Sequence, residues 1–353
     1  MSLTEGQRSS LLALQLGRVL FDEPMSRHTS FRIGGPVDAW VKVRDEVALM
    51  NLLQWCKREA LPVFPLGGGC NLLVRDGGIR GVALRLGKGF RRLAFVRDPA
   101  SELQDEGSEV DAVSRFSASV EAVGGVAEPH KESGVALPVD EDGRVRLHVG
   151  SGVVVPTLLR FCVRHGLGGV EGLGGVPGTI GGALVMNAGT HEGELGDVVE
   201  ELYVVDGQER RVLQPTEFSF SYRKLVLPEG ALILGALLAL RPRSGEQVQQ
   251  EIRELVHYRK NTQPTGLPSA GCLFKNPDVG PPAGKLIDEA GLKGLQVGGA
   301  RVSEVHANYV VSDGKAQAAD VLELMDQVKN RVQSIHGIDL RPEVRVVGSD
   351  PPG

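Results

Sequence analysis

The sequence predicts a protein of mixed helix and strand, in the α+β class, with two or three domains. Its 353 residues are enough for several cores, and 41% of them are hydrophobic, as in soluble globular proteins. Glycine-rich, strand-like segments dominate as far as residue 243, and amphipathic helices dominate after it. We therefore expect the C-terminal third, residues 244–353, to form a separate α+β lobe.

The N-terminal part begins with a strand–helix–strand pattern. Apolar residues, among them Val47, recur at helical intervals in residues 45–60, and short apolar runs at 39–43 and 62–64 flank this segment. We therefore expect one helix between two strands.

The middle of the chain contains an unusual segment. Residues 97–143 are polar and acidic without a sustained period, and they are too many for an ordinary connection, so we expect a disordered or loosely ordered insertion. A regular pattern resumes with a strand at 145–149 and a helix at 156–165, which Gly166 ends.

Two long helices and a final strand are predicted in the C-terminal third. The helices cover residues 244–261 and 316–336, with Gly337 ending the second, and the strand covers 340–347. The inward face of the first helix is expected to consist of Val248, Ile252, Leu255 and Val256.

Charge and composition exclude several classes of partner. The formal net charge of −5 gives no general field for nucleic acid or an anionic membrane. The longest apolar run, residues 231–240, is too short to cross a bilayer, and the first residues lack an export signal. The four cysteines are far apart and have no C-x-x-C spacing, which predicts reduced thiols, a cytoplasmic location and no metal site.

Two glycine clusters are the clearest indication of a ligand site. Residues 166–189 hold ten glycines in twenty-four positions, and Gly67, Gly68 and Gly69 follow a short apolar strand. Such glycines serve either tight turns or a backbone surface whose amides bind a phosphate. Neither cluster has the G-x-G-x-x-G spacing of a Rossmann fold or the lysine of a P-loop. The sequence therefore favours a nucleotide bound in another fold.

Three short segments carry unusual polar residues among apolar ones: FSFSYR at 218–223, PSAGCLFKNP at 268–277 and LRPEVR at 340–345. Taken singly, Arg223, Cys272 and Glu343 could each be an ordinary surface or buried residue. Together they supply a cation, an acid and a carboxylate. Such a set could stabilise an enolate and then protonate it.

Five ordered motifs carry a family resemblance. GVPGTIGGALVMNAG, FSYR, PSAGCLFKNP, AGKLIDEAGLKG and RPEVR closely resemble motifs of the UDP-N-acetylenolpyruvoylglucosamine reductases, FAD enzymes of peptidoglycan synthesis. The resemblance implies a three-lobed flavoprotein. Lobes at 1–90 and 91–243 would hold FAD in the vanillyl-alcohol-oxidase (PCMH) manner, and a lobe at 244–353 would bind the UDP-sugar.

The resemblance also implies a reaction. NADPH reduces the flavin, the enolpyruvyl ether of UDP-N-acetylglucosamine takes up hydride at C3, and its C2 enolate is protonated to give UDP-N-acetylmuramate. Arg223 would stabilise the enolate and Glu343 would assist. Cys272 stands where the family usually has a proton-donating serine, and a thiol is a stronger acid than an alcohol.

The remaining site residues are carried over by position. For FAD they are Gly67, Gly68, Gly69, Cys70, Asn71 and Leu72 in the first glycine cluster, and Pro177, Gly178, Thr179, Gly181, Gly182, Asn187 and Gly189 in the second. For the UDP-sugar they are Tyr222, Arg259, Lys275, Asn276, Lys285, Gln296 and His306. The short segment 224–233 favours the shorter-loop subtype of the family, and a monomer acting on a small molecule is expected.

Two other readings stay open. An FAD-linked oxidase of the same fold would act on a sugar or lactone and react with oxygen. A catalytically silent flavin- or nucleotide-binding protein would bind the cofactor without turnover, as the changed proton-donor position allows. A fold alone does not choose among these activities.

Overall fold

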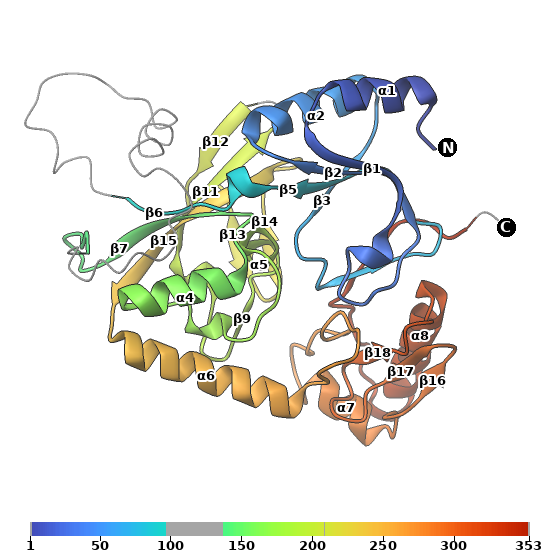
Figure 1. The fold of residues 1–353 in the computed structure, drawn as a ribbon. Coiled ribbons are helices and arrows are strands. Elements are labelled where there is room, and N and C mark those ends of the chain that lie inside the picture. Colours follow the sequence, from blue (N-terminus) through green and yellow to red (C-terminus); the bar gives the residue numbers. More distant parts are fainter. Residues whose placement is uncertain (1, 97–136, 208, 352–353) are drawn as a thin grey trace, which may run out of the picture. The chain divides into compact units, whose positions relative to one another are not determined.

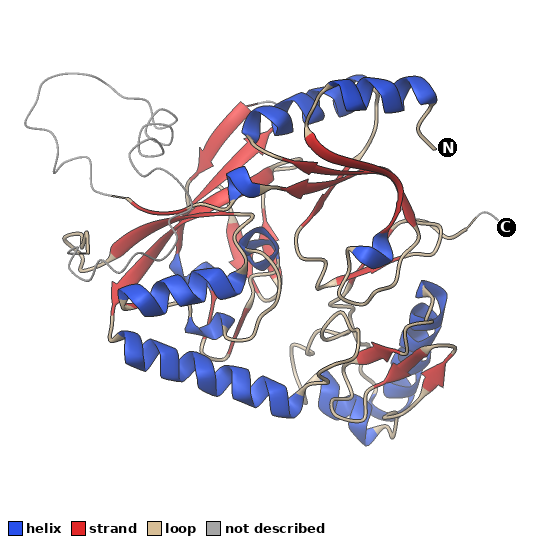
Figure 2. Ribbon diagram, in the orientation of Figure 1, coloured by secondary structure: helices blue, strands red, loops and turns tan. Residues whose placement is uncertain are grey.

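The computed structural model describes residues 2–96, 137–207 and 209–351. The chain divides into two compact units. Unit 1 contains Met1–Arg85 and His257–Gly353, and unit 2 contains Leu86–Val256. Both units mix helices and strands, as the α+β class predicts (Figures 1 and 2). The division into three lobes at residues 90 and 243 stays a prediction.

The N-terminal half of unit 1 is a sheet with the strand order β1-β2-β5-β3. Strands β1 and β2 are antiparallel, whereas β3 and β5 are parallel. Helices α1 and α2 lie along one side of this sheet (Figure 1). The bounds are α1 Glu5–Ala13, β1 Gly17–Pro24, β2 Pro36–Val43, α2 Glu46–Arg58, β3 Val63–Leu66, β5 Ile79–Leu86 and the 3-10 turn η1 Met25–Arg27.

The predicted helix at 45–60 is confirmed as α2. Asp45 caps it, because its carboxylate accepts a hydrogen bond from the Ala48 amide at 2.9 Å. Its buried face is shifted from the expected one: Val47 is exposed, whereas the buried residues are Ala48, Leu49, Leu52, Trp55 and Cys56. Helix α1 and strand β1 are not among the elements predicted from the sequence.

The C-terminal half of unit 1 packs a small antiparallel sheet, β16-β17-β18, with helices α7 and α8. The predicted helix at 316–336 is confirmed as α8, and Gly337 ends it with a left-handed φ of 69°. The buried side of α8 shares one core with Phe31 and Leu73 from the N-terminal half. The bounds are α7 Ala283–Glu289, β16 Gln296–Val297, β17 Ala300–Val302, β18 Val310–Ser312 and α8 Ala318–His336.

The end of the chain pairs with the N-terminal half of unit 1. Strand β19, Arg345–Val347, runs parallel to β4, Leu72–Val74. The predicted strand at 340–347 is therefore wrong over residues 340–344. These residues instead bond the segment around Cys272: Phe274 and Pro342 form a bridge, and the Glu343 amide donates to the Leu273 carbonyl at 2.7 Å.

Asp76, in the turn between β4 and β5, caps helix α8 from a distant part of the chain. Its carboxylate accepts from the Ala318 amide at 2.8 Å and from the Ala319 amide at 2.9 Å. We expect Asp76→Ala to lower the free energy of unfolding by about 1–2 kcal/mol, because two helix-end amides lose their acceptor. Guanidinium unfolding measures this. Asp278→Ala, which removes only the exposed ion pair with Arg341, should change it by less than about 0.5 kcal/mol. Equal losses in both variants would contradict the capping role.

Unit 2 is built on a sheet with the order β12-β11-β15-β7-β6, and β8 pairs with β15 off this path. Helices α4 and α5, together with α6 up to residue 256, belong to the same unit. The bounds are η2 Lys88–Phe90, β6 Leu93–Phe95, β7 Val145–Gly150, α4 Val155–His165, β8 Leu167–Gly168, η4 Glu171–Leu173, α5 Ile180–Val185, β9 Gly189–Thr190, β10 Gly193–Glu194, η5 Leu195–Val198, β11 Val199–Asp206, β12 Glu209–Leu213, β13 Ser219–Ser221, β14 Lys224–Val226, β15 Leu232–Pro242 and α6 Gly245–Thr262.

The predicted elements of unit 2 are confirmed in outline. The strand at 145–149 is β7, the helix at 156–165 is α4 and the helix at 244–261 is α6. Gly166 ends α4 in the left-handed conformation with φ 60°. One part of the expected apolar face is wrong. Val256 is 43% exposed, although Val248 and Leu255 are buried.

Most of the predicted insertion at 97–143 lies outside the described residues, because the structure describes only 137–143 of it. Residues 140–143 form a turn before β7, in which the Gly143 amide donates to the Asp140 carbonyl at 3.0 Å.

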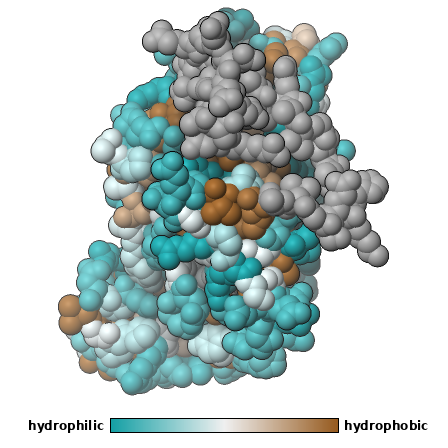
Figure 3. All heavy atoms as spheres, turned by 90° about the vertical axis from the view of Figure 1, so that its left-hand side faces the viewer, coloured by the Kyte–Doolittle hydropathy of each residue, from teal (hydrophilic) through white to brown (hydrophobic). Residues whose placement is uncertain are grey.

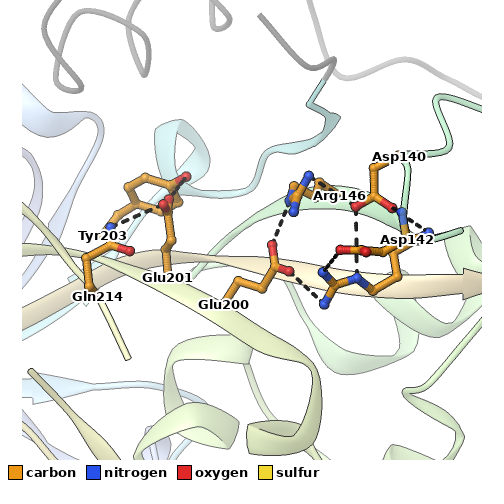
Figure 4. Close-up of polar contacts among 8 residues, drawn as sticks. Asp140, Asp142, Arg146, Glu200, Glu201, Tyr203 and Gln214 are labelled. Atoms are coloured by element: carbon orange, nitrogen blue, oxygen red, sulfur yellow. Dashed lines mark hydrogen bonds and ion pairs between the residues drawn. The ribbon is translucent and has the colours of Figure 1, made fainter. Parts of the chain in front are cut away.

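A cluster of charged side chains joins this turn to the sheet. Figure 4 shows Asp140, Arg146 and Glu200 pointing toward one another. Arg146 pairs with Asp140 at 3.1 Å and with Glu200 on β11 at 2.7 Å. The Arg144 amide and the neighbouring arginines lower the pKa of Asp140. The side chains of Asp140, Arg146 and Glu200 are 10–31% exposed, so water still screens the cluster in part.

The surface on the left-hand side of Figure 1 is mostly hydrophilic, with small hydrophobic areas (Figure 3). Within residues 2–96, 137–207 and 209–351, no helix has the length and apolar character needed to cross a membrane.

His148 on β7 is a buried titratable group in unit 2. Its ring lies 5.0 Å from the Tyr203 ring, and burial, with a smaller effect of Arg92, lowers its pKa from 6.5 to about 4. The unfolded chain therefore binds a proton below pH 6.5 that the folded chain does not bind until about pH 4. Stability is retained above pH 6.5 and falls as the pH decreases toward 4, by up to about 3 kcal/mol.

We expect His148→Phe to flatten this loss of stability, as measured by chemical unfolding at pH 7.5 and pH 5. His191→Ala is the control, because the His191 side chain is exposed. A His148 variant that keeps the full difference between the two pH values would show that another group is responsible.

Candidate active site

The first glycine cluster forms a turn in unit 1 between β3 and β4. Gly69 has φ 66°, and a Cβ there would lie 2.1 Å from the His28 carbonyl oxygen, so the backbone admits only glycine. The Gly69 carbonyl accepts from the Ser30 amide at 3.0 Å. The amides of Gly68, Gly69 and Cys70 donate to no acceptor among the described residues. Such consecutive amides suit an anion such as a pyrophosphate.

The segment carrying Cys272 lies between two other segments of unit 1. On one side, the Leu273 amide donates to the Asn308 carbonyl at 2.8 Å, and Cys272 pairs with Tyr309 in an antiparallel bridge. On the other side, the Glu343 amide donates to the Leu273 carbonyl. The fold therefore places Cys272 between two segments that are distant in the sequence.

Asn308 fixes this segment through its side chain. Its Oδ1 accepts from the Phe274 amide at 3.0 Å, and its Nδ2 donates to the Phe274 carbonyl at 2.8 Å. Asn308 is only 3% exposed, so both bonds are shielded from water. Sequence reasoning missed this residue. The available signal was an asparagine directly before the apolar strand in HANYVV.

Hydrogen bonds of Ser30 and Asn71 link the glycine turn to the Cys272 segment and to the segment around Glu343. The Ser30 hydroxyl donates a hydrogen bond to the Ser269 carbonyl oxygen at 2.7 Å. The same hydroxyl lies 3.4 Å from the Gly69 carbonyl oxygen. The Asn71 side chain donates to the Glu343 carbonyl at 3.1 Å, and the Arg345 amide donates to the Asn71 carbonyl at 3.1 Å. Within unit 1, the structure thus brings together the predicted cofactor turn and the two segments that carry Cys272 and Glu343.

Tyr309 is a buried tyrosine close enough to Cys272, Arg259 and Glu343 for their charges to affect its pKa. It is 8% exposed, and burial raises the pKa of its phenol. After burial, the charge of Cys272 raises the phenol pKa most, Arg259 lowers it, and hydrogen bonding with Cys272 and the charge of Glu343 raise it. Arg259, predicted to contact the sugar nucleotide, therefore lies within electrostatic reach of this cluster.

His306 also reaches the cluster, through the T-shaped contact of its ring with Tyr309 at 5.0 Å. Burial lowers the pKa of His306, so its ring favours the neutral form. Its Nδ1 accepts from the Asn308 amide at 3.2 Å. Burial likewise raises the pKa of the Cys70 thiol in the glycine turn.

The other residues predicted to bind the UDP-sugar lie on neighbouring parts of unit 1. Lys275 is half-buried, and its amide donates to the Arg341 carbonyl. Asn276 caps α7 by accepting from the Ala283 amide at 3.0 Å, and Gln296 donates to the Gly298 carbonyl at 2.8 Å. Lys285 is exposed on α7 beside Glu289. These contacts of Asn276, Gln296 and Lys285 are local and lie outside the Cys272 cluster.

The second glycine cluster, in unit 2, holds the short helix α5. The Ile180 amide donates to the Val153 carbonyl at 2.8 Å, and the Gly181 amide donates to the Ser151 carbonyl at 3.0 Å. Thr179 caps the helix, since its hydroxyl accepts from the Gly182 amide at 3.5 Å. Gly178, after Pro177, has φ 109°. Part of this cluster therefore serves the packing of α5.

Asn187 and Gly189 follow α5 in the same unit. Asn187 is buried, and its side chain bonds Glu194, the Ser221 carbonyl and the Gly196 amide. A Cβ at Gly189 would lie 2.3 Å from the Gly193 carbonyl oxygen across the β9–β10 pair. Asn187 and Gly189 therefore stabilise the local fold, whether or not they also contact a cofactor.

Arg223 and Tyr222 form the turn of the hairpin between β13 and β14. Arg223 has φ 55°, and its guanidinium donates to the Gly189 carbonyl at 3.4 Å. The Tyr222 ring centroid lies 5.3 Å from the Arg223 guanidinium carbon. This places Arg223 beside the second glycine cluster in unit 2, whereas Cys272 and Glu343 belong to unit 1.

The comparisons with known proteins define the class of this protein as a flavoprotein. A family model described as FAD binding domain matches residues 136–212, which confirms the predicted cofactor and fold class. A second model, described as UDP-N-acetylenolpyruvoylglucosamine reductase, C-terminal domain, matches residues 263–347.

Individual relatives extend this match over nearly the whole chain. The UDP-N-acetylenolpyruvoylglucosamine reductase of Desulfosudis oleivorans is 39% identical, over 98% of this chain and 100% of that protein. Reductase 2 of Symbiobacterium thermophilum is 40% identical, over 95% of this chain and 94% of its own. The crystal structure of MurB from Thermus caldophilus superimposes with a TM-score of 0.68 at 33% identity, covering 93% of this chain and 98% of that one. The chain belongs to the UDP-N-acetylenolpyruvoylglucosamine reductase family.

Proposed function

We propose that this protein reduces UDP-N-acetylglucosamine enolpyruvate to UDP-N-acetylmuramate, with FAD as cofactor and NADPH as the hydride donor. The observation that carries the proposal is the joining, within unit 1, of the glycine turn at 67–71 with Cys272 and Glu343. The protein would act on this small molecule as a cytoplasmic monomer. The short connection at 227–231, between β14 and β15, supports the shorter-loop subtype.

The residues of unit 1 fit a bound dinucleotide. The amides of Gly68, Gly69 and Cys70 suit its pyrophosphate, and the close approach of Gly69 to His28 leaves no room for a side chain in that turn. Leu72 and the second cluster, from Pro177 to Gly189, are the further contacts we assign to it. When bound, FAD supplies the hydride that reduces the enolpyruvyl group.

The chain itself supplies the proton and the charge balance. Cys272 gives its thiol proton to C2 of the substrate, so that the S–H bond breaks as the C–H bond forms. The Arg223 guanidinium neutralises the substrate carboxylate, into which the enolate is delocalised, and Glu343 assists the proton transfer. For the sugar nucleotide we assign Tyr222, Arg259, Lys275, Asn276, Lys285, Gln296 and His306.

The test uses the purified protein with its flavin. NADPH oxidation is followed by absorbance with and without UDP-N-acetylglucosamine enolpyruvate, and the product is identified by mass spectrometry. We expect consumption that depends on the enolpyruvyl substrate and yields UDP-N-acetylmuramate. A flavin that reacts with oxygen and a sugar alcohol instead would favour an oxidase. A bound flavin without turnover would favour a silent binding protein.

A further inference from the structure

We propose that Tyr309 is a positioning residue for Cys272: its hydroxyl donates a hydrogen bond to the Cys272 sulfur, orients the thiol and stabilises the thiolate left after proton transfer. The proposal deepens the function above and rests on the role of Cys272 as proton donor. It assigns a task to a residue that the sequence patterns did not single out.

Backbone geometry places the two side chains together. Cys272 and Tyr309 face each other across an antiparallel bridge, and residues directly opposite in such a pair have Cβ atoms about 4.5–5.5 Å apart on the same side. The Tyr309 backbone is fixed in turn, since its amide donates to the His306 carbonyl at 2.9 Å and its carbonyl accepts from the Ser303 amide at 2.8 Å. These bonds hold the Tyr309 backbone opposite Cys272.

The Cys272 backbone is held as firmly as that of Tyr309. The two bonds between the Asn308 side chain and Phe274, together with the bond from the Leu273 amide to the Asn308 carbonyl, fix the residues next to the thiol. The side chain of Cys272 then has its hydrogen bond with Tyr309 to set its direction.

The groups around Tyr309 decide which partner donates. Burial raises the pKa of the phenol most, the nearby Cys272 and then Glu343 raise it further, and Arg259 lowers it. The phenol therefore stays neutral and keeps its proton to donate. A hydrogen bond to a charged sulfur is stronger than one to a neutral thiol, so the bond favours the thiolate. His306 meets Tyr309 through the edge of its ring.

The alternative role for Tyr309 is that of a buried aromatic ring that fills space. Tyr309→Phe separates the two roles, because it keeps the ring and removes only the hydroxyl. The matched control is Tyr258→Phe, which removes the hydroxyl of a tyrosine on α6 that is 60% exposed.

The first measurement is the rate of alkylation of Cys272 by iodoacetamide in the FAD-loaded protein without substrate. The rate is resolved by peptide mass spectrometry between pH 6.5 and pH 10. We expect Tyr309→Phe to slow alkylation about tenfold at pH 7.5, because the Cys272 thiolate loses one hydrogen bond. The maximal rate at high pH, where the thiol is fully ionised, should stay unchanged. Cys70 is the internal reference, and its alkylation should stay as in the parent.

The second measurement follows the two half-reactions of the flavin. Tyr309→Phe should leave reduction by NADPH unchanged and slow reoxidation by the enolpyruvyl substrate about threefold to tenfold, because a weaker acid donates the proton. An alkylation profile equal to that of Tyr258→Phe would overturn the proposal. A shifted profile with unchanged reoxidation would instead uphold the hydrogen bond and reject Cys272 as the proton donor.

Discussion

Replacement of Cys272 by alanine is expected to slow reoxidation of the reduced flavin by the enolpyruvyl substrate by about a hundredfold or more, the usual contribution of a general acid. Reduction of the flavin by NADPH should proceed at the parental rate, because that step requires no proton from the thiol. Stopped-flow absorbance of the flavin measures the two half-reactions separately. A slower reoxidation with an unchanged rate of reduction indicates that a general acid has been lost, whereas a damaged fold would slow both half-reactions.

Cys272→Ser is the matched control for this experiment. It keeps a side chain of similar size that can donate a proton, and it introduces the serine that the family resemblance implies at this position, so it should keep much of the activity. Cys272 is half-buried and the hydrogen bonds of its segment come from Leu273 and Phe274, so neither variant should unfold the chain. Equal reoxidation in Cys272→Ala and the parent would reject the thiol as the donor.

Replacement of Gly69 by alanine should lower the free energy of unfolding by more than about 3 kcal/mol and reduce the FAD content of the purified protein. Alanine at φ 66° costs about 1–2 kcal/mol by itself. The added Cβ would also lie 2.1 Å from the His28 carbonyl oxygen, so the backbone of the turn must move. The amides assigned to the pyrophosphate move with it. The ratio of flavin to protein absorbance and a chemical unfolding curve measure both effects.

Gly143→Ala provides the comparison for this variant. Gly143 has a similar φ of 74°, but a Cβ there meets no atom within 4 Å. It should therefore show the cost of the left-handed backbone alone, with the FAD content unchanged. If Gly69→Ala matched it in both measurements, the close approach to His28 would have no importance for the cofactor.

Much of the fold could be predicted because its signals are local. Helices α2, α4 and α8 follow from apolar periodicity and from caps or glycine stops next to them in the sequence, and α6 follows from its periodicity. Buried faces were less certain, since Val256 continues the apolar pattern of α6 and is nevertheless exposed. A helix pattern shows which residues can share a face but not how far the neighbouring core extends.

The candidate site was predictable residue by residue but not as an arrangement. The family motifs pointed to Cys272 and Glu343, and the glycines pointed to a nucleotide. Asn308 and Tyr309 carried no comparable signal, because a buried asparagine and a buried tyrosine are recognisable only by the groups they bond. The expected strand at 340–344 failed for a related reason, since those residues bond the Cys272 segment instead.

The sequence by itself determined helices α2, α4, α6 and α8, the glycine turns, the family and the chemical type of the predicted site residues, because each depends on side chains and backbone freedom encoded within a few neighbouring positions. Tertiary structure alone decided that Asp76 caps α8, that β19 pairs with β4, and that Cys272 lies opposite Tyr309 in an antiparallel bridge. Hydrogen bonds between distant segments depend on strand pairing and burial. Those are properties of the folded chain that no local stretch of residues contains.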